Sequence, residues 1–526
     1  MSDTPTTVSR SALSFFSGTL LTRVTGMMRD MTMAFFFGTS PALAAFFFAY
    51  RFVYLLRRLL GEGLLHQGFV PHFEAKSAQD PKQGALFFRD LFGSLLLVLI
   101  GILVLSETGI SLFLASSRGT EGGRFIAQLS RWMLPGIVFI CLFGLTGGLL
   151  QARRRFFLPA VSGAVFNIIW IVGVVTLYFF QAENAVVLLA GILSIAFFFQ
   201  WAITAPIVWK ELRSSLSRWE LFRPKVFSSQ LKLLFAPLLL GMIGVASMQI
   251  NSAVDVIFAR YASPEGPAYL WYAIRLQQLP LALFGIALSS ALLPSLSRAV
   301  ARAETEKFDS LLSFSMKRCV SLIFPCAIGI FVLGAASINL LFGRGGFGAA
   351  STHQTTLCLW GYGIGLLPAA FIQILAPAFY AQKEYYTPMW GFSASSLFNI
   401  LLNGLFVFGL GFGAASVALS TSLSTWLNAL YLWNRLKRKG GEEVPCFGKA
   451  ALCSLLAGGV TLVLGAAFLG DPTLDLFYGR PYGFPREFLG QLSLFAFQAA
   501  LFFGTLLSFT RLLKVESPFD FLYSSR

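Results

Sequence analysis

The chain has 526 residues, of which 56% are hydrophobic and only 12% are charged. Soluble domains contain about 25% charged residues, so this composition excludes an ordinary soluble enzyme, and its apolar content excludes intrinsic disorder. Lys and Arg total 40 against 24 Asp and Glu, a formal net charge of +16. A nucleic-acid-binding protein would place basic and aromatic side chains on a wet surface, whereas Phe here falls in apolar runs such as 35–37 and 197–199. The composition predicts a polytopic membrane protein that binds no nucleic acid.

Long apolar stretches predict the membrane spans. A spanning helix needs about 20 mostly apolar residues, and these runs lack the two-residue alternation of β-barrel strands. We expect an all-α protein of about 14 transmembrane helices, of which the first, second and eighth are the least apolar. In chain order the predicted spans are 12–37, 42–70, 86–106, 126–150, 158–180, 185–207, 230–257, 267–296, 311–335, 356–381, 387–409, 413–434, 447–469 and 490–512.

The distribution of charge over the loops predicts the orientation. Basic residues cluster after every second span, within 76–82, 153–155, 210–225, 298–307 and 435–439. Cytoplasmic loops are enriched in Lys and Arg, so both termini are expected in the cytoplasm. The other loops hold only Arg118, Arg124, Arg260, Arg344, Arg480 and Arg486.

Two pairs of matching segments indicate an internal duplication. Residues 40–71 resemble 263–294 in the order of their Ser-Pro, Arg and Pro positions, and Phe166-Asn167-Ile168 recurs as Phe398-Asn399-Ile400. The matches predict two six-helix lobes, 1–210 and 229–440, joined by a basic cytoplasmic linker at 211–228. Residues 441–526 would add two transmembrane helices and a tail. Repeated lobes of this kind commonly surround a central site in transporters.

Charged side chains inside the predicted spans are the candidate functional residues. Each Arg or Asp at a helix centre costs about 2.5–3.5 kcal/mol on insertion scales, so such residues should face a wet cavity or one another. At helical spacing Arg23 and Asp30 share one face of the first span. These spans contain Arg23, Arg29 and Asp30 in the first, Arg51, Arg57, Arg58 and Glu62 in the second, and Arg275 in the eighth.

Arginine outnumbers carboxylate in these spans, so we predict that a bound anion balances the surplus positive charge. The guanidinium group binds phosphate oxygens in a bidentate manner, so we expect a phosphorylated or otherwise acidic cargo. For the end of the second span an alternative is an ion pair between Arg58 and Glu62, with Arg57 reaching the membrane surface. Gln249, Asn251 and Asp255 of the seventh span would either line the same cavity or hold helices together.

Signals for enzymes and cofactors are poor. The six Cys residues show no metal-ligand spacing. No Asp-Asp-x-x-Asp motif is present for Mg²⁺, and residues 343–346 lack the spacing and the Lys of a Walker A loop. We expect a non-enzymatic protein with no metal and no cofactor.

Several motifs resemble the MurJ/MviN family of lipid II flippases, in the multidrug/oligosaccharidyl-lipid/polysaccharide exporter superfamily. The N-terminal signature is carried by 22–30 (TRVTGMMRD), Phe37-Gly38, 55–63 (LLRRLLGEG) and 67–71 (QGFVP). Residues 292–297 (LLPSLS) and 375–380 (LAPAFY), with Thr387-Pro388, are also similar. The resemblance extends over nearly the whole chain, and fourteen helices is the family's number.

The resemblance implies a function. The family moves undecaprenyl-pyrophosphate-linked disaccharide-pentapeptide, the peptidoglycan precursor lipid II, to the outer leaflet of the bacterial inner membrane. Its cavity arginines match Arg23, Arg29 and Arg275, and Arg57 and Asp30 lie in matching motif positions. The resemblance also implies a groove on the last two helices for the polyprenyl tail. Lipid II and membrane lipid are the expected partners, and cell-wall synthesis proteins are further candidates.

The sequence departs from the family pattern at four positions of the second and eighth spans. An Asp is frequent where this chain has Ala44, Pro-Asn is usual at Val53 and Tyr54, and an acidic residue is usual at Ile274. These departures bring a carboxylate-dependent gating step into question. Two alternatives stay open: export of another lipid-linked oligosaccharide or amphipathic molecule, and a non-transporting scaffold for cell-wall enzymes.

Overall fold

The computed structural model describes residues 5–59, 64–116, 119–153, 155–182, 184–226, 249–437, 448–469, 473, 485 and 487–513. These residues are mostly helical, and none of them lies in a strand. Within this part of the chain, nine helices are long and apolar enough to cross a membrane. The prediction of an all-α polytopic membrane protein is therefore confirmed. The nine leave out the first, second, seventh, eighth and twelfth predicted spans; charged side chains interrupt the apolar sequence of the first, second and eighth, and residues 227–248 of the seventh lie outside the described part.

The described residues form two compact units. Unit 1 comprises 5–36 and 40–253, and unit 2 comprises 37–39 and 254–513, so the division falls inside a helix over 249–262. Unit 1 contains α1 (Pro5–Phe37), α2 (Pro41–Arg57), α3 (Leu64–Gln79), α4 (Pro81–Ala115), α5 (Glu121–Met133), α6 (Pro135–Ala152), α7 (Phe157–Phe179), α8 (Ala185–Ala202), α9 (Ala205–Ser215) and α10 (Arg218–Leu221).

Unit 2 begins within the helix over 249–262. Its helices are α12 (Gly266–Pro280), the π-helical turn η2 (Leu281–Gly285), α13 (Ile286–Ala301), α14 (Thr305–Phe342), α15 (Ala349–Ile364), α16 (Leu366–Ala381), α17 (Tyr386–Gly404), the π-helical turn η3 (Leu405–Gly409), α18 (Ala415–Lys437), α19 (Gly448–Leu469) and α21 (Phe488–Leu512).

Several predicted spans are interrupted in the structure. The fourth is divided into α5 and α6 and the tenth into α15 and α16, while the second covers α2 and the start of α3, with residues 60–63 outside the described part of the chain. Pro135 starts α6 because a proline has no N–H to donate and is tolerated in the first turn. In the eighth span, Pro280 ends α12 and the π-helical turn η2 follows, as expected where a proline removes a backbone hydrogen bond.

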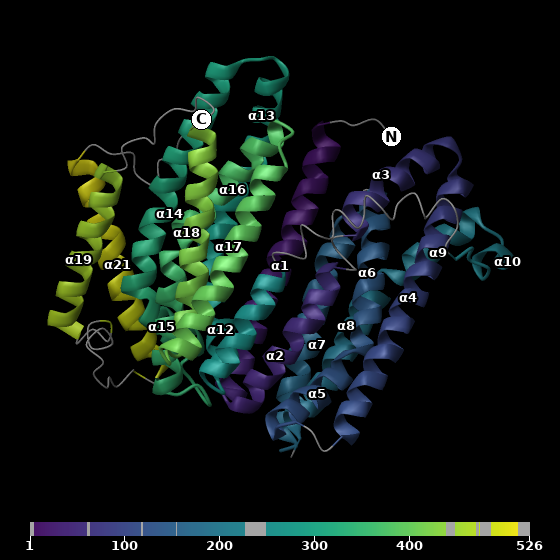
Figure 1. Ribbon diagram of the computed structural model, residues 1–526, viewed down its shortest axis with the longest axis horizontal. Coiled ribbons are helices and arrows are strands. Elements are labelled where there is room, and N and C mark those ends of the chain that lie inside the picture. The colour runs from purple at the N-terminus through teal and green to yellow at the C-terminus, as the bar shows by residue number, and fades with distance from the viewer. Residues whose placement is uncertain are drawn as a thin grey trace. The chain divides into compact units, whose positions relative to one another are not determined.

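Small residues let the helices of unit 1 approach closely. α6, α7 and α8 pack side by side, and α2 packs on α5 and α6 (Figure 1). A Cβ atom at Gly18 of α1 would lie only 2.7 Å from Cβ of Ala160 on α7. Thr22 lies one turn further along α1, and its hydroxyl donates to the carbonyl of Ala160 at 2.7 Å. This contact brings the charged part of α1 against α7, as small residues do between membrane helices.

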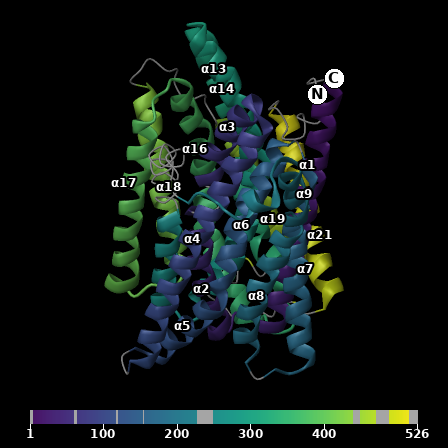
Figure 2. The same ribbon diagram turned by 90° about the vertical axis from the view of Figure 1, so that its right-hand side faces the viewer.

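In unit 2, the two C-terminal helices pack on α14. α19 and α21 lie side by side in both ribbon views (Figures 1 and 2) and share a buried cluster with α14 that includes Val332, Cys453 and Phe502. α15, α17 and α18 form a second bundle in which α18 contacts both neighbours. The C-terminal helices are thus part of unit 2 rather than a separate domain.

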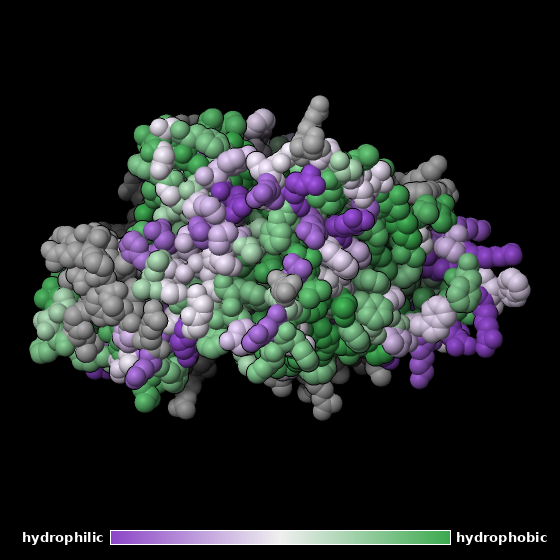
Figure 3. Space-filling view, turned by 90° about the horizontal axis from the view of Figure 1, so that it is seen from below, coloured by the Kyte–Doolittle hydropathy of each residue, from purple (hydrophilic) through white to green (hydrophobic). Residues whose placement is uncertain are grey.

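Large apolar side chains are exposed along the helices. Leu105, Phe179 and Phe468 are each more than 70% exposed, and Figure 3 shows hydrophobic residues over much of one face. A soluble monomer rarely exposes contiguous apolar surface of this kind. The exposure is that of helices whose outer sides contact lipid.

Candidate functional site

Arg29 and Asp30 form a buried ion pair in the C-terminal third of α1. Nε and Nη2 of Arg29 donate to Oδ1 of Asp30 at 3.0 and 2.7 Å, and both side chains are less than 10% exposed. Charge-assisted hydrogen bonds of this kind are about twice as strong as neutral ones. The carboxylate thereby neutralises the arginine inside the membrane, where an isolated guanidinium would be costly.

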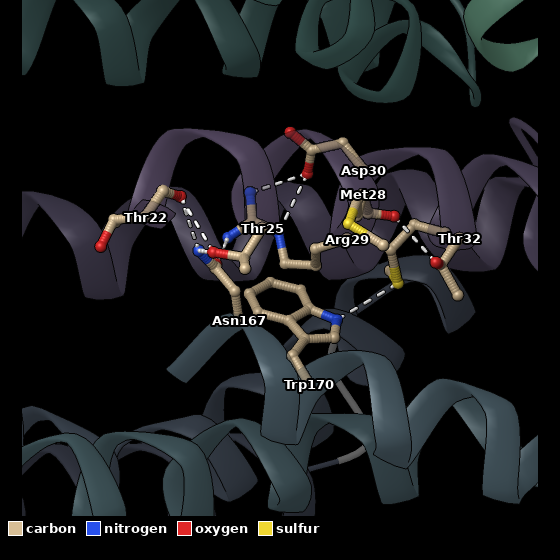
Figure 4. A network of polar contacts seen from close by, with 9 residues as sticks. Thr22, Thr25, Met28, Arg29, Asp30, Thr32, Asn167 and Trp170 are labelled. Carbon is tan, nitrogen blue, oxygen red and sulfur yellow. Dashed lines mark hydrogen bonds and ion pairs between the residues drawn. The ribbon is translucent and has the colours of Figure 1, made fainter. Parts of the chain in front are cut away.

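α7 supplies the remaining contacts of Arg29. Nη1 of Arg29 donates to Oδ1 of Asn167 at 3.1 Å, and the guanidinium lies 4.6 Å from the ring centroid of Trp170. The amide nitrogen of Asn167 donates to the Thr22 carbonyl and the Thr25 hydroxyl, both at 3.1 Å. Figure 4 shows the guanidinium between the indole ring and the Asp30 carboxylate. We call Thr25, Arg29, Asp30, Asn167 and Trp170 the Arg29 network.

Arg23 lies in a different environment from Asp30. Its side chain is exposed, and it makes no hydrogen bond or ion pair with the described residues, whereas Asp30 is only 2% exposed. The expectation that these two residues share one face of a helix therefore does not bring them together. Arg23 retains all five of its N–H donors for a ligand.

Arg51 and Arg57 of α2, with Arg58 directly after that helix, gather around Tyr54. The guanidinium carbons of Arg57 and Arg58 each lie 5.5 Å from its ring centroid, and that of Arg51 lies 6.0 Å away. Nε and Nη2 of Arg58 donate to the phenol oxygen at 3.2 and 3.1 Å. Arg51 also donates to the carbonyl of Ser252 at 3.4 Å. The residue that departs from the family pattern thus organises these side chains.

Aromatic rings link the two groups of arginines. Tyr50 contacts Trp170 with ring centroids 5.5 Å apart and Tyr54 with centroids 6.3 Å apart. Trp170 is 1% exposed, and its Nε1 lies 3.2 Å from the Met33 sulfur. Cation–π contacts contribute about 0.5–2 kcal/mol each, more where water is excluded. Unit 1 therefore holds Arg29 on one end of an aromatic row and the α2 arginines on the other.

Unit 2 contains a second buried polar network. Oδ1 of Asp255 accepts from the Asn403 amide at 2.9 Å, and Oδ2 accepts from the Thr421 hydroxyl at 3.0 Å. The Asn403 amide also donates to Oδ1 of Asn399 at 2.9 Å. These four residues, here called the Asp255 network, join the helix over 249–262 to α17 and α18. Such bonds correspond to the helix-bridging role that was one of the two expectations for Asp255.

Arg275 lies on α12 of unit 2 and is half-buried. Its guanidinium carbon is 4.2 Å from the ring centroid of Trp271, one helical turn earlier. The π face of that ring favours a cation close above it. Gln249 and Asn251, also half-buried, lie at the start of the described part of the helix over 249–262, and Glu62 is outside the described residues.

An ion pair of the same composition, not predicted from the sequence, lies in the third span. Arg89 and Asp90 on α4 repeat the Arg-Asp doublet of α1, with Nε and Nη2 of Arg89 at 2.9 and 2.5 Å from Oδ1 of Asp90. The contacts of Asn167, Trp170 and Tyr54 with the arginines were not predicted either. Of these residues, Arg89 and Asp90 could have been found from the sequence, because they are charged residues within an apolar stretch.

Among the described residues, no three His, Cys, Asp or Glu side chains gather in a way that could hold a metal ion. The groups that the structure brings together in unit 1 are cations on aromatic rings. Such an arrangement can bind an anion, because the planar guanidinium groups offer several N–H donors in an apolar environment.

Comparison with known proteins identifies relatives over nearly the full length. The family model described as lipid II flippase MurJ matches residues 33–474. A probable lipid II flippase MurJ of Chlamydia pneumoniae is 30% identical over 522 residues, covering 98% of this chain and 94% of the relative. The lipid II flippase MurJ of Burkholderia cenocepacia is 29% identical over 506 residues, covering 94% of this chain and 96% of the relative.

Solved structures share the fold. A lipid II flippase MurJ in an inward closed conformation matches with a TM-score of 0.72 and 23% identity, covering 94% of this chain and 99% of that one. An inward-facing transporter of the multidrug resistance MATE family, in the MOP superfamily, matches with a TM-score of 0.63 and 16% identity, covering 82% of this chain and 98% of that one.

Proposed function

The chain belongs to the MurJ family of lipid II flippases, and we propose that it moves lipid II from the cytoplasmic to the outer leaflet of the membrane. It is a transporter and carries out no chemical step on its cargo. The pyrophosphate of lipid II is the anion that the surplus arginines of the membrane helices require. Arg23, Arg29 and Arg275 bind it, with Arg57 assisting.

The observation that carries this proposal is the placement of arginines in unit 1. Arg29 rests on Trp170, and Arg57 and Arg58 rest on Tyr54, in helices that expose apolar surface elsewhere. A network built only for stability would balance its charges, whereas the sequences of these helices hold more Arg than carboxylate. Bidentate binding to phosphate oxygens accounts for the choice of Arg over Lys.

Asp30 gives the site a defined resting state. In the structure it occupies Nε and Nη2 of Arg29, the two donors that would chelate a phosphate. Pyrophosphate therefore reaches Arg29 by displacing Asp30, while exposed Arg23 provides the first contact. This exchange lets the empty transporter keep a neutral pair inside the membrane, since a lone buried charge is strongly destabilising.

Transport follows from alternating access of the two six-helix lobes predicted by the repeat. The head group is held in the central cavity while the polyprenyl tail stays in lipid, along the last two helices. Moving a net charge across the membrane couples the step to the membrane potential, at about 2.3 kcal/mol per charge per 100 mV. Both termini lie in the cytoplasm, and cell-wall synthesis proteins are further candidate partners.

Reconstitution into liposomes with labelled lipid II tests the proposal. We expect label to appear in the opposite leaflet with the parent chain and not with the triple variant Arg23→Ala, Arg29→Ala, Arg275→Ala. The matched control removes three exposed basic residues of unit 2, Arg298→Ala, Arg302→Ala and Lys307→Ala, and should transport normally. Full activity of the first triple variant would overturn the arginine site, and transport of another lipid-linked sugar but not lipid II would overturn the cargo.

A further inference from the structure

A surface of exposed aromatic side chains lies on α9 and α10. Trp219 and Phe222 are 75% and 72% exposed, and Trp209 is 42% exposed. The rings of Trp209 and Phe222 contact each other with centroids 5.7 Å apart. Large aromatic rings this exposed next to a polar loop mark a surface that something covers. We call these three residues and the basic residues among them the α9–α10 surface.

The basic residues of this surface are not paired with acidic side chains in the part of the chain that the structure describes. No ion pair joins any of them to the described residues, and Arg223 stacks on Trp219 with its guanidinium carbon 5.2 Å from the ring centroid. All of them are exposed, and hydrophilic atoms project from the right-hand edge of Figure 3, where α10 lies in Figure 1. They are Lys210, Arg213, Arg218, Arg223 and Lys225.

The two acidic residues of the segment are directed to other helices. Glu211 pairs with Arg153 at 2.5 Å, and Glu220 pairs with Lys82 at 2.8 Å. Hydrogen bonds from Lys82 and from Ser217 lower the pKa of Glu220 to about 2, so this carboxyl stays ionised at any physiological pH. The negative charges of the segment are thus used within unit 1, and the outward face is left purely basic.

The inner side of the segment is fixed to the bundle. Val208, Leu212 and Leu221 are buried against α3, α4 and α6. Nη1 of Arg89 donates to the Glu220 carbonyl at 2.6 Å, and Oδ1 of Asp90 accepts from the backbone N–H of Lys225 at 2.9 Å. The α9–α10 surface is therefore held rigidly rather than carried on a loose loop.

We propose that the α9–α10 surface binds the anionic phospholipid headgroups of the leaflet from which α8 emerges, and so fixes that end of unit 1 at the membrane surface. α8 ends at Ala202 and α9 begins at Ala205, so the surface follows directly on a membrane span. Aromatic side chains at the headgroup level and Lys or Arg beside them are the residues that anchor helices at this depth. The charge and the position favour lipid over a protein partner.

Hydrogen–deuterium exchange of the full chain in nanodiscs tests whether the α9–α10 surface binds anionic headgroups. We compare bilayers of phosphatidylcholine alone with bilayers containing about one third phosphatidylglycerol. Backbone amides between Ser217 and Val226 should exchange about fivefold more slowly in the anionic bilayer for each basic residue engaged. High salt should abolish the difference because it screens headgroup charge.

The variant Arg218→Gln, Arg223→Gln, Lys225→Gln should lose this lipid dependence. Its matched control is Arg298→Gln, Arg302→Gln, Lys307→Gln, which removes the same charge at a place where Arg302 and Lys307 pair with Glu304. Equal exchange of the parent chain in both bilayers would overturn the proposal, as would slowing that needs an added cytosolic protein. If the triple variant fails to fold, the effect of salt on the exchange of the parent chain in the anionic bilayer still tests the proposal.

Discussion

Unit 1 contains the same Arg-Asp doublet twice, in two different settings. In both pairs, Nε and Nη2 of the arginine donate to one carboxylate oxygen, and Nη1 reaches a third group. For Arg89 that group is the backbone carbonyl of Glu220 in α10. Asp90 also accepts a hydrogen bond from the backbone N–H of Lys225, which follows α10. For Arg29 it is the side chain of Asn167, with the Trp170 ring beneath.

The difference separates a structural pair from a candidate binding pair. Besides bonding to each other, Arg89 and Asp90 bond to backbone groups of α10 and of the residues that follow it. Arg29 bonds to Asp30 and to the side-chain amide of Asn167, and Arg23 lies exposed on the same helix. Side chains can exchange one partner for another at low cost when each bond lost is replaced. Only the α1 pair is thus arranged to open for an anion.

Replacing both members of each pair gives the largest expected effect. Arg29→Gln with Asp30→Asn should lower lipid II transport about 100-fold or more, because two charge-assisted hydrogen bonds of about 1.5–3 kcal/mol each are lost in the loaded state. The chain should still fold, since no buried charge is left alone. Leaflet exchange in proteoliposomes and thermal unfolding in detergent measure the two quantities.

Arg89→Gln with Asp90→Asn is the control for that experiment. It removes the same groups in the same local geometry, so its transport rate per folded molecule should stay near that of the parent. A parent-like rate for the α1 double variant would show that both pairs are structural. A loss of transport in the α4 double variant at full folding would contradict the distinction between them.

The sequence identified the pair but not its partners. Arg29 and Asp30 stand out because they interrupt an apolar stretch, yet adjacent residues do not face each other on a helix. Their pairing depends on the arginine bending along α1 toward Asn167 and Trp170, and α7 reaches that position through the Thr22–Ala160 contact. Such long-range packing has no local signature. Helix breaks at Pro135 and Pro280 were likewise obscured by hydropathy.

The Asp255 network provides a comparison in unit 2. Asn399 is the repeat counterpart of Asn167, but the hydrogen bonds of its network join an Asp, two Asn and a Thr. We expect Thr421→Val to cost about 1.5–3 kcal/mol of stability, because a buried carboxylate loses a donor. Thermal unfolding should show the loss, while transport per folded molecule changes little. A transport defect larger than the folding defect would place this network in the transport cycle.

Trp170 should contribute a smaller effect than its neighbours in the Arg29 network. Trp170→Phe keeps an aromatic face beneath Arg29, whereas Trp170→Leu removes it. With a cation–π contribution of about 0.5–2 kcal/mol, transport should fall roughly 2- to 30-fold in the Leu variant relative to the Phe variant. Competition by inorganic pyrophosphate against labelled lipid II separates weakened anion binding from misfolding. Equal rates in the two variants would remove Trp170 from the site.

Tyr54→Phe should give the smallest change, and it tests whether the departure from the family pattern has acquired a role. The ring remains as a platform for Arg57, and only the phenol oxygen that accepts two N–H groups of Arg58 is lost. A hydrogen bond to a charged group contributes about 1.5–3 kcal/mol when buried, but Arg58 is only half-buried, so solvent replaces much of it. We therefore expect the lipid II concentration at half-maximal rate to rise about threefold at unchanged maximal rate. A lower maximal rate would instead mean that the Tyr54–Arg58 contact changes during transport, which would make α2 as well as α1 a part of the site that opens.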